Sequence, residues 1–263
     1  MYYYKASLQY IGTNYFGFQY QKALKTVQGE INLAIGKILK CKFSTVASSR
    51  TDTGVHANIQ ILKITTEYKI NLDNFIHELN RNLPDDINFL SVEETQSSFK
   101  PTMLSSSKEY RYFFTNEKVI KKENLNLLAN ISQPLDIQAI QNCLKYLIGL
   151  NDFQNFYSTG SNIRSTKRNI IECDLSLISP SQIFTDSNFF QFPESISQVY
   201  QLRIKADGFL KQMIRHIVSA LWMVGTGKLS EKEFLEHLTG PKSQKQKWKI
   251  APASGLILYK IYY

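Results

Sequence analysis

The first third of the chain switches between two hydrophobic periods, which predicts short strands and two amphipathic helices. Apolar and polar residues alternate over 4–10, as in a half-buried strand. Apolar residues recur at helical spacing over 27–38 and 72–83, and Thr26 and Asn71 are placed to cap these helices. Three further strands are predicted at 43–47, 59–64 and 87–92. The resulting order is β-α-β-β-α-β, which is that of the ferredoxin-like fold.

A polar, serine-rich connector at 97–107 leads into a second region with the same plan. Tyr110, Tyr112 and Phe114 share one face of its first strand, and Arg111 lies on the other face. Helices are predicted at 137–148, 209–224 and 231–238, and strands at 171–177, 200–206 and 256–262. Residues 179–197 fit neither half and are interpreted as an insertion or a long loop. We therefore predict an α+β fold of two ferredoxin-like halves, 1–98 and 99–263, whose antiparallel sheets join around a central cleft.

A polar loop at 48–57, between two of the predicted strands, is the most informative stretch of the sequence. Asp52 is its only acid and lies between Arg50 and His56, and Gly54 can adopt the positive φ that a tight loop needs. Cationic neighbours keep a carboxylate ionised near neutral pH. The simpler alternative is an Asx-turn in which Asp52 only caps its own loop, but this alternative explains few of the surrounding residues.

Composition and charge narrow the class of protein. The net charge of +9 and the pI near 9.3 favour a polyanionic partner, with nucleic acid as the leading candidate and a membrane surface as the rival. The 15 Tyr and 16 Phe suit RNA, whose bases stack on aromatic rings, although most of these rings must be core residues. No apolar run approaches the roughly 20 residues of a membrane span, and the N-terminal residues lack a signal-peptide pattern. Three widely spaced cysteines indicate neither a disulfide framework nor a zinc site, so we expect a cytoplasmic protein.

Several blocks of the sequence resemble the tRNA pseudouridine synthase A family. The stretch Arg-Thr-Asp-Thr-Gly-Val-His-Ala at 50–57 is similar to the signature of that family. Further similar blocks follow the family order along nearly the whole chain, at 26–28, 82–87, 108–112, 167–170, 209–218 and 253–256. The chain departs from the family pattern where Ser49 replaces glycine, where Phe18 replaces tryptophan, at Ile11, and at 100–102, which reads Lys-Pro-Thr.

This resemblance implies an isomerase that converts uridine to pseudouridine in tRNA. It implies that Asp52 is the catalytic aspartate, acting either as a nucleophile at C1′ or as a base on a sugar proton. Tyr110 would stack on the flipped base, and Arg215 would pair with Asp52 and keep it ionised. Arg50 would fill the space that the flipped uridine leaves. The simpler alternatives are a core aromatic for Tyr110, a solvated cation for Arg215 and a second partner of Asp52 for Arg50.

The predicted RNA-binding set comprises Arg50, His56, Lys167 and Arg168, with His56 interpreted as a loop-stabilising hydrogen-bonding group rather than an acid or base. Phosphates would also be followed by a set of scattered lysines, Lys121, Lys122, Lys242, Lys245 and Lys247. No cofactor or metal is expected, because the reaction involves neither redox change nor group transfer. The resemblance further implies a homodimer that acts on the anticodon stem-loop, at tRNA positions 38 to 40. A ferredoxin-like RNA-binding or tRNA-folding protein without catalysis is the competing hypothesis.

Overall fold

The computed structural model describes residues 1–117, 126–160, 163–179, 189–190, 196–241 and 248–263. The chain divides into two compact units. Unit 1 comprises Met1–Lys108 and Ile257–Tyr263, and unit 2 comprises Glu109–Leu256. Helices and mostly antiparallel strands occur in both units, so the predicted α+β class is confirmed.

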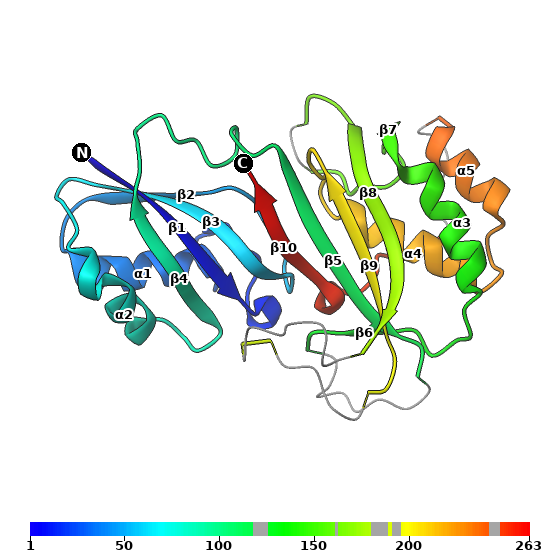
Figure 1. Ribbon diagram of the computed structural model, residues 1–263, viewed down its shortest axis with the longest axis horizontal. Helices are drawn as coiled ribbons and strands as arrows, with labels where there is room; N and C mark the ends of the chain where they lie inside the picture. Colours follow the sequence, from blue (N-terminus) through cyan, green and yellow to red (C-terminus); the bar gives the residue numbers. More distant parts are fainter. Residues whose placement is uncertain (118–125, 161–162, 180–188, 191–195, 242–247) are drawn as a thin grey trace. The chain divides into compact units, whose positions relative to one another are not determined.

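Unit 1 contains a sheet with the strand order β4-β1-β3-β10, and β2 pairs with one part of β3 (Figure 1). The pairs of β1 with β3, β1 with β4, and β2 with β3 are antiparallel, whereas β10 runs parallel to β3. Helices α1 and α2 pack against each other and bury their apolar positions against this sheet. The elements in chain order are β1 (Tyr2–Tyr10), η1 (Gly12–Asn14), α1 (Val27–Leu39), β2 (Phe43–Ala47), β3 (His56–Thr66), α2 (Leu72–Asn82), β4 (Ile87–Glu94) and β10 (Leu256–Tyr262).

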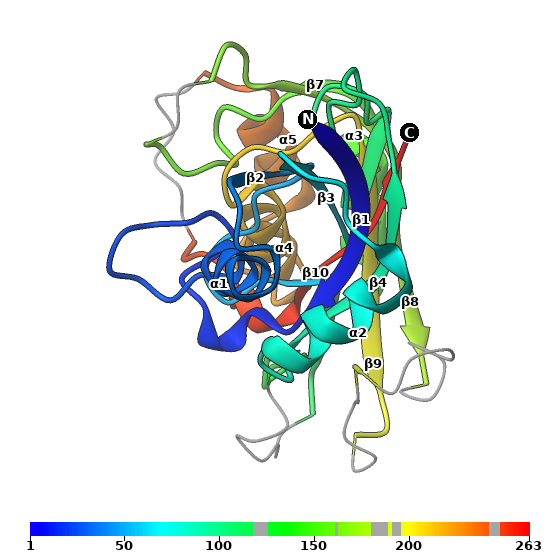
Figure 2. The same cartoon turned by 90° about the vertical axis from the view of Figure 1, so that its left-hand side faces the viewer.

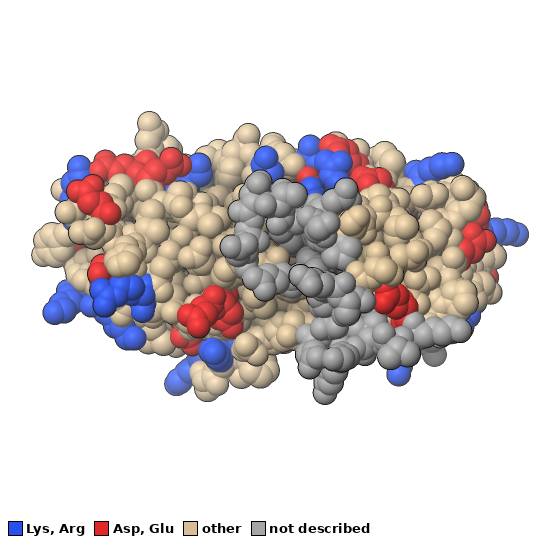
Figure 3. All heavy atoms as spheres, turned by 60° about the horizontal axis from the view of Figure 1, so that its bottom comes forward, with Lys and Arg blue, Asp and Glu red and all other residues tan. Residues whose placement is uncertain are grey.

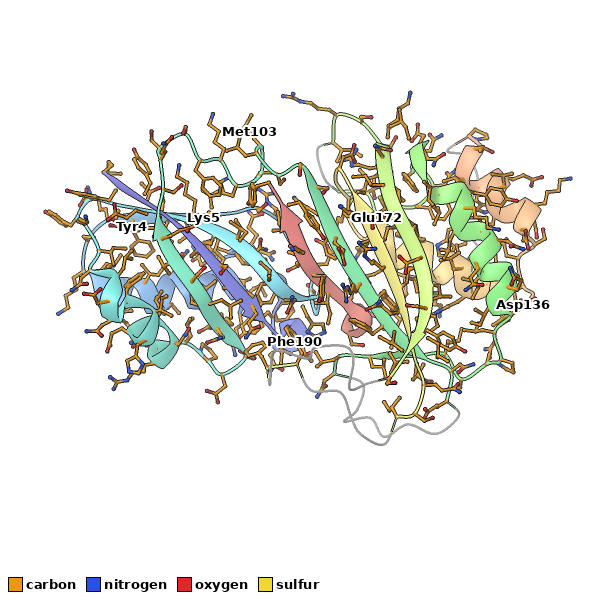
Figure 4. The ribbon with its side chains drawn as sticks, in the orientation of Figure 1. Tyr4, Lys5, Met103, Asp136, Glu172 and Phe190 are labelled. Carbon is orange, nitrogen blue, oxygen red and sulfur yellow. The ribbon has the colours of Figure 1, made fainter. Side chains whose placement is uncertain are left out.

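The alternation that predicted β1 corresponds to its two faces. Tyr4 and Lys5 are neighbours on this strand (Figure 4). Tyr4 is fully buried and its hydroxyl accepts a hydrogen bond from the Ile70 N–H at 2.7 Å. Lys5 belongs to the opposite face, where its ammonium pairs with Glu93 at 2.9 Å. One face of β1 therefore contributes to the core and the other meets water.

Unit 2 contains a sheet with the strand order β5-β9-β8-β7, in which β6 runs parallel beside β5. Its pairs of β7 with β8 and of β8 with β9 are antiparallel. Helix α3 packs against α4, α5 and β8. The elements are β5 (Ser107–Thr115), β6 (Ala129–Asn130), α3 (Ile137–Leu147), β7 (Gly149–Asp152), β8 (Lys167–Ile178), β9 (Val199–Ala206), α4 (Met213–Gly225), α5 (Glu231–Thr239) and η4 (Ala253–Gly255).

The two faces of β5 differ as the sequence predicts. Tyr112 and Phe114 are buried, and their rings lie 6.0 and 5.5 Å from the ring of Trp222 on α4. On the other face, the buried carboxylate of Glu109 accepts ion pairs from Arg111 at 3.0 Å and from Arg203 at 3.2 Å. The network continues to Glu172 on β8, which is labelled in Figure 4. A charged layer therefore covers the face of β5 opposite α4.

Several predicted boundaries are corrected. Helix α4 begins at Met213 and not at residue 209, because Gln212 takes a left-handed conformation with φ 59° that interrupts the helix. Strand β3 begins at His56, inside the stretch predicted as a loop, and β8 begins at Lys167. Strands β6 and β7 were not expected from the sequence. Most of the predicted insertion at 179–197 lies outside the described residues.

Capping explains why the helix starts were predictable. The side chains of Thr26, Asn71 and Asp136 accept hydrogen bonds from backbone N–H groups in the first turns of α1, α2 and α3.

In the described ranges, no helix is both long and apolar enough to cross a membrane. Cys41, Cys143 and Cys173 are free thiols.

Candidate active site

The Asp52 loop, residues 48–55, is fixed mainly through its backbone. The Phe18 N–H donates to the Thr51 carbonyl oxygen at 3.1 Å. The hydroxyls of Thr51 and Tyr10 are 2.7 Å apart and form a buried hydrogen bond. Asp52 follows directly and is half-buried. The backbone that carries the Asp52 carboxylate is therefore held by hydrogen bonds to the Thr51 carbonyl and to the Thr51 side chain.

Residues 11–26, here called the N-terminal loop, pack closely against the Asp52 loop. A Cβ atom added at Gly12 would lie 2.0 Å from the Val55 carbonyl oxygen. A Cβ atom at Gly17 would lie 2.9 Å from the Thr51 carbonyl oxygen, and Gly17 also has a φ of +89°. Only glycine avoids both the contact and the left-handed strain at this position. These two glycines were not among the predicted site residues. Their place beside family blocks was the signal that could have identified them.

His56 supports the loop from its C-terminal side. Its ring is fully buried, and Nδ1 accepts a hydrogen bond from the Gly12 N–H at 3.0 Å. Because a backbone N–H can only donate, Nδ1 carries no proton and the ring is neutral. In this conformation His56 offers no surface to RNA and acts as the loop-stabilising group that the sequence suggested. Gly54 has φ +77°, which is the positive φ that the sequence predicted.

The departures from the family pattern in this region are accommodated through backbone groups. The Ser49 N–H donates to the Gln60 side chain at 3.2 Å, and Gln60 Nε2 donates to the Ser49 carbonyl at 2.8 Å. The Ser48 hydroxyl donates to the Pro101 carbonyl at 2.8 Å. Lys108 Nζ donates to the Ser48 carbonyl at 2.8 Å, and burial lowers the pKa of Lys108 to about 8.

Tyr110 lies on β5 in unit 2 and its side chain is buried, with 6% of the residue exposed. Its ring meets the ring of Phe209 edge to face, with centroids 5.1 Å apart. Phe209 was predicted to open α4, but the helix starts at Met213, so Phe209 precedes it. The aromatic pair thus joins the first strand of unit 2 to the segment that leads into α4.

Arg215 lies in the first turn of α4 and is half-buried. Its Nε donates to the Ala251 carbonyl at 2.7 Å, and the Ala251 N–H donates to the Arg215 carbonyl at 3.3 Å. A cation in the first turn opposes the helix dipole, so its position is electrostatically unfavourable for the helix alone. The two hydrogen bonds with Ala251 tie the first turn of α4 to the segment before η4.

His216, which follows Arg215, was not among the predicted site residues. His216 is buried, and its Nε2 lies 3.0 Å from the Ser158 hydroxyl. Burial, and secondarily the charge of Arg215, lowers the pKa of His216 to about 4. A neutral histidine is therefore built into α4 beside the predicted catalytic arginine.

The predicted RNA-binding cations occupy exposed or partly exposed positions. Arg50 and Lys167 are exposed, and Arg168 is half-buried at the start of β8. Arg168 Nε lies 3.6 Å from the position that a Cβ at Gly208 would take, next to Phe209. Arg168 is therefore a near neighbour of Gly208, the residue before Phe209. Lys121, Lys122, Lys242, Lys245 and Lys247 lie outside the described residues.

Unit 1 thus carries Arg50, Asp52 and His56, and unit 2 carries Tyr110, Arg168 and Arg215. On the face drawn in Figure 3, the coloured lysine and arginine side chains are interspersed with acidic ones and do not merge into one patch. Among the residues that the structure describes, no three His, Cys, Asp or Glu side chains are grouped as metal ligands would be.

Comparison with known proteins identifies the family. The model of the tRNA pseudouridine synthase family matches residues 6–101 and 143–263. The tRNA pseudouridine synthase A of Thermoanaerobacter sp. (strain X514) is 35% identical over 97% of this chain and 97% of its own length. The proteins of the same name from Acetivibrio thermocellus and Listeria monocytogenes are each 33% identical, over 98% and 99% of this chain and 98% of their own lengths. The chain therefore belongs to the tRNA pseudouridine synthase family, whose members are isomerases that act on tRNA.

Among solved structures, an unknown protein from Galdieria sulphuraria aligns with 85% of this chain and 91% of its own. The TM-score of 0.23 and the identity of 11% are too low for this likeness to support an inference.

Proposed function

We propose that this enzyme converts uridine to pseudouridine in the anticodon stem-loop of tRNA, at positions 38 to 40, and that Asp52 is its catalytic aspartate. The observation that supports this role most strongly is the Asp52 loop itself. A half-buried carboxylate is attached to a backbone fixed by close glycine contacts and by the Phe18 and Tyr10 hydrogen bonds. The choice of the anticodon stem-loop rests on the resemblance of the sequence blocks to the family A enzymes.

The reaction is an isomerisation in which no atom of the nucleotide is gained or lost. The N1–C1′ bond of uridine breaks, the base turns, and a C5–C1′ bond forms. The proton on C5 leaves and N1 gains a proton, so that the balance closes. Asp52 assists the first bond cleavage, either by attacking C1′ or by accepting a sugar proton, and both roles require the ionised carboxylate.

We propose that Tyr110 and Arg215 serve the same reaction from unit 2. Tyr110 stacks on the turned base and helps remove the C5 proton, and its partner Phe209 holds the ring in place. Arg215 pairs with Asp52 and keeps the carboxylate ionised. Support for the arginine comes from its unfavourable position in the first turn of α4 and from the Ala251 carbonyl that fixes its Nε.

We assign RNA contacts to Arg50, Lys167 and Arg168, which are the predicted cations with exposed or partly exposed side chains. Arg50 replaces the flipped uridine in the stem, and the other two contact phosphates. The proposal also includes a cytoplasmic homodimer and ferredoxin-like halves. In unit 1, the element order β-α-β-β-α-β and the strand order β4-β1-β3-β2 support the ferredoxin-like assignment.

The test measures tritium release from C5-labelled uridine in unmodified tRNA. Asp52→Asn should abolish release and leave tRNA affinity within a few fold, because the carboxylate faces the sugar and not the phosphates. Asp85→Asn removes the same charge from an exposed position of unit 1 and should retain full activity. Residual turnover of Asp52→Asn within about tenfold of wild type, roughly 1.4 kcal/mol of barrier, would exclude the catalytic role.

Two controls address the substrate and the competing function. A tRNA with cytidine in place of uridine at positions 38 to 40 should release no tritium, and full release would exclude the anticodon assignment. Binding of tRNA by the wild-type protein without any release would favour the non-catalytic RNA-binding alternative.

A further inference from the structure

The N-terminal loop exposes two aromatic rings next to two buried ones. Phe16 and Tyr20 are 51% and 58% exposed, whereas Tyr15 and Phe18 are each only 1% exposed. The buried pair anchors the loop in the core of unit 1. The exposed pair leaves about half of its surface in water and therefore gains less from burial than the buried pair does. One loop therefore carries two exposed rings that are available to a ligand.

Backbone hydrogen bonds fix the segments that bear these exposed rings. The Phe16 N–H donates to the Lys25 carbonyl at 2.9 Å, and Gln21 Nε2 donates to the Phe16 carbonyl at 3.1 Å. The Tyr20 N–H donates to Gln28 Oε1 at 2.9 Å. Because these hydrogen bonds hold the backbone at Phe16 and at Tyr20, little backbone freedom remains to be lost when a ligand binds.

The same loop is attached to the Asp52 loop. The Phe18 N–H donates to the Thr51 carbonyl, and the Gly54 N–H donates to the Tyr15 carbonyl at 3.3 Å. Phe16 therefore lies between two residues that contact the Asp52 loop directly. Figure 2 shows this blue loop beside α1, projecting away from the sheet of unit 1 toward the left of the view. Phe16 is thus at the margin of the proposed catalytic loop, and Tyr20 follows four residues later in the same N-terminal loop.

The charge of the N-terminal loop identifies the class of ligand. Lys22 and Lys25 are exposed, and residues 11–29 contain no acidic residue. From outside this stretch, Asp86 accepts hydrogen bonds from the Asn14 and Tyr15 side chains of the loop. Exposed aromatic rings beside cations are a combination with which proteins bind unpaired RNA, since bases stack on the rings and phosphates pair with the cations. A target uridine that leaves its stem also leaves its neighbours without a stacking partner.

We propose that Phe16 and Tyr20 stack on the bases of nucleotides beside the target uridine, while Lys22 and Lys25 contact their phosphates. This inference rests on the proposed function, because it assumes that the target uridine reaches Asp52. The two rings replace the stacking that the flanking bases lose and hold the tRNA strand at the margin of the catalytic loop.

The test compares the affinity of full-length protein for an unmodified tRNA transcript by fluorescence anisotropy. Phe16→Ala and Tyr20→Ala should each raise the Kd about five- to tenfold, in line with the loss of one stacked base. Phe16→Tyr and Tyr20→Phe retain the rings and should stay within twofold of wild type. Tyr68→Ala is the matched control: Tyr68 is 70% exposed in unit 1, but it follows the far end of β3, roughly 35 Å from His56.

Salt dependence separates stacking from charge. Phe16→Ala and Tyr20→Ala should shift the plot of log Kd against log salt without changing its slope, because stacking releases no counterions. Replacement of Lys22 and Lys25 by alanine should lower the slope by about one to two. A Kd unchanged in both aromatic variants, or an equal loss in Tyr68→Ala, would overturn the proposal.

The tritium assay on the same proteins distinguishes failure of the stacking proposal from failure of the proposed activity. Wild-type turnover with aromatic variants that bind normally would refute the stacking proposal alone. Absence of turnover in the wild type, with tRNA binding that depends on Phe16 and Tyr20, would refute the proposed activity and uphold the stacking surface.

Discussion

Replacement of Gly17 by alanine tests whether the N-terminal loop positions Asp52. The added Cβ would meet the Thr51 carbonyl oxygen at 2.9 Å and the Asp52 carbonyl carbon at 3.4 Å. Both are backbone atoms, so relief of the contact must move one loop relative to the other by about half an ångström. The φ of +89° adds a conformational cost of roughly 1–2 kcal/mol for any L side chain.

The two costs have different consequences. Both costs lower the free energy of unfolding, and the displacement in addition acts on the carboxylate. A misplacement of about 1 Å can reduce the rate about 100-fold, so a shift of half that size should lower kcat about tenfold. Affinity for tRNA should change little, because the substitution adds no charge and removes no exposed ring.

Gly149→Ala provides the matched control. Gly149 has φ +94°, and a Cβ there would meet nothing within 4 Å. Gly149→Ala should lose roughly 1–2 kcal/mol in urea unfolding and Gly17→Ala at least as much, and only Gly17→Ala should lose kcat in tritium release at saturating tRNA. A folded Gly17→Ala enzyme with kcat within twofold of wild type would refute the positioning argument. An equal loss of kcat in Gly149→Ala would refute it as well.

Two further predictions concern charge. The pKa of His216 lies near 4 in the folded protein against an ordinary value of 6.5, so the unfolded chain binds the proton first as pH falls. Stability should therefore decrease between about pH 6.5 and 4, by at most about 3 kcal/mol, and His216→Gln should flatten this dependence in urea unfolding at a series of pH values. Arg215→Ala should raise the pKa of Asp52 and move the acidic limb of the pH–rate profile upward; an unmoved limb would contradict the proposed pair, and Arg215→Lys should restore charge but not orientation.

Local signals account for the part of the fold that the sequence predicted well. Capping residues and apolar periodicity lie within a few positions of the elements they define, so α1, α2, α3 and β2 were predicted within one or two residues. The start of α4 was missed because apolar residues continue through Phe209 and Leu210 at helical spacing. The left-handed Gln212 that interrupts them has no signature in composition.

In the candidate site, too, residues were predictable where the sequence signal is local. Asp52 was singled out as the only acid of a polar loop, and Tyr110 and Arg215 were named through family motifs, which are contiguous in sequence. The contacts of Gly12 and Gly17 with the Asp52 loop join residues about 35 to 45 positions apart, and no local pattern reports such a distance. The acid was therefore predictable from the sequence, whereas the loop that supports it was not.

The departures from the family pattern give less support to a non-catalytic protein than the sequence suggested. Phe18 replaces a tryptophan, yet it is buried and its ring packs 5.9 Å from that of Tyr10, so the position still fills the core. Ser49 is held by its own N–H and carbonyl, and Pro101 contributes only its carbonyl to Ser48. Any residue with the same backbone conformation supplies these groups. Since the departures lie where backbone contacts or core volume are required, they leave the support of Asp52 intact, and a test of function belongs on Asp52 itself.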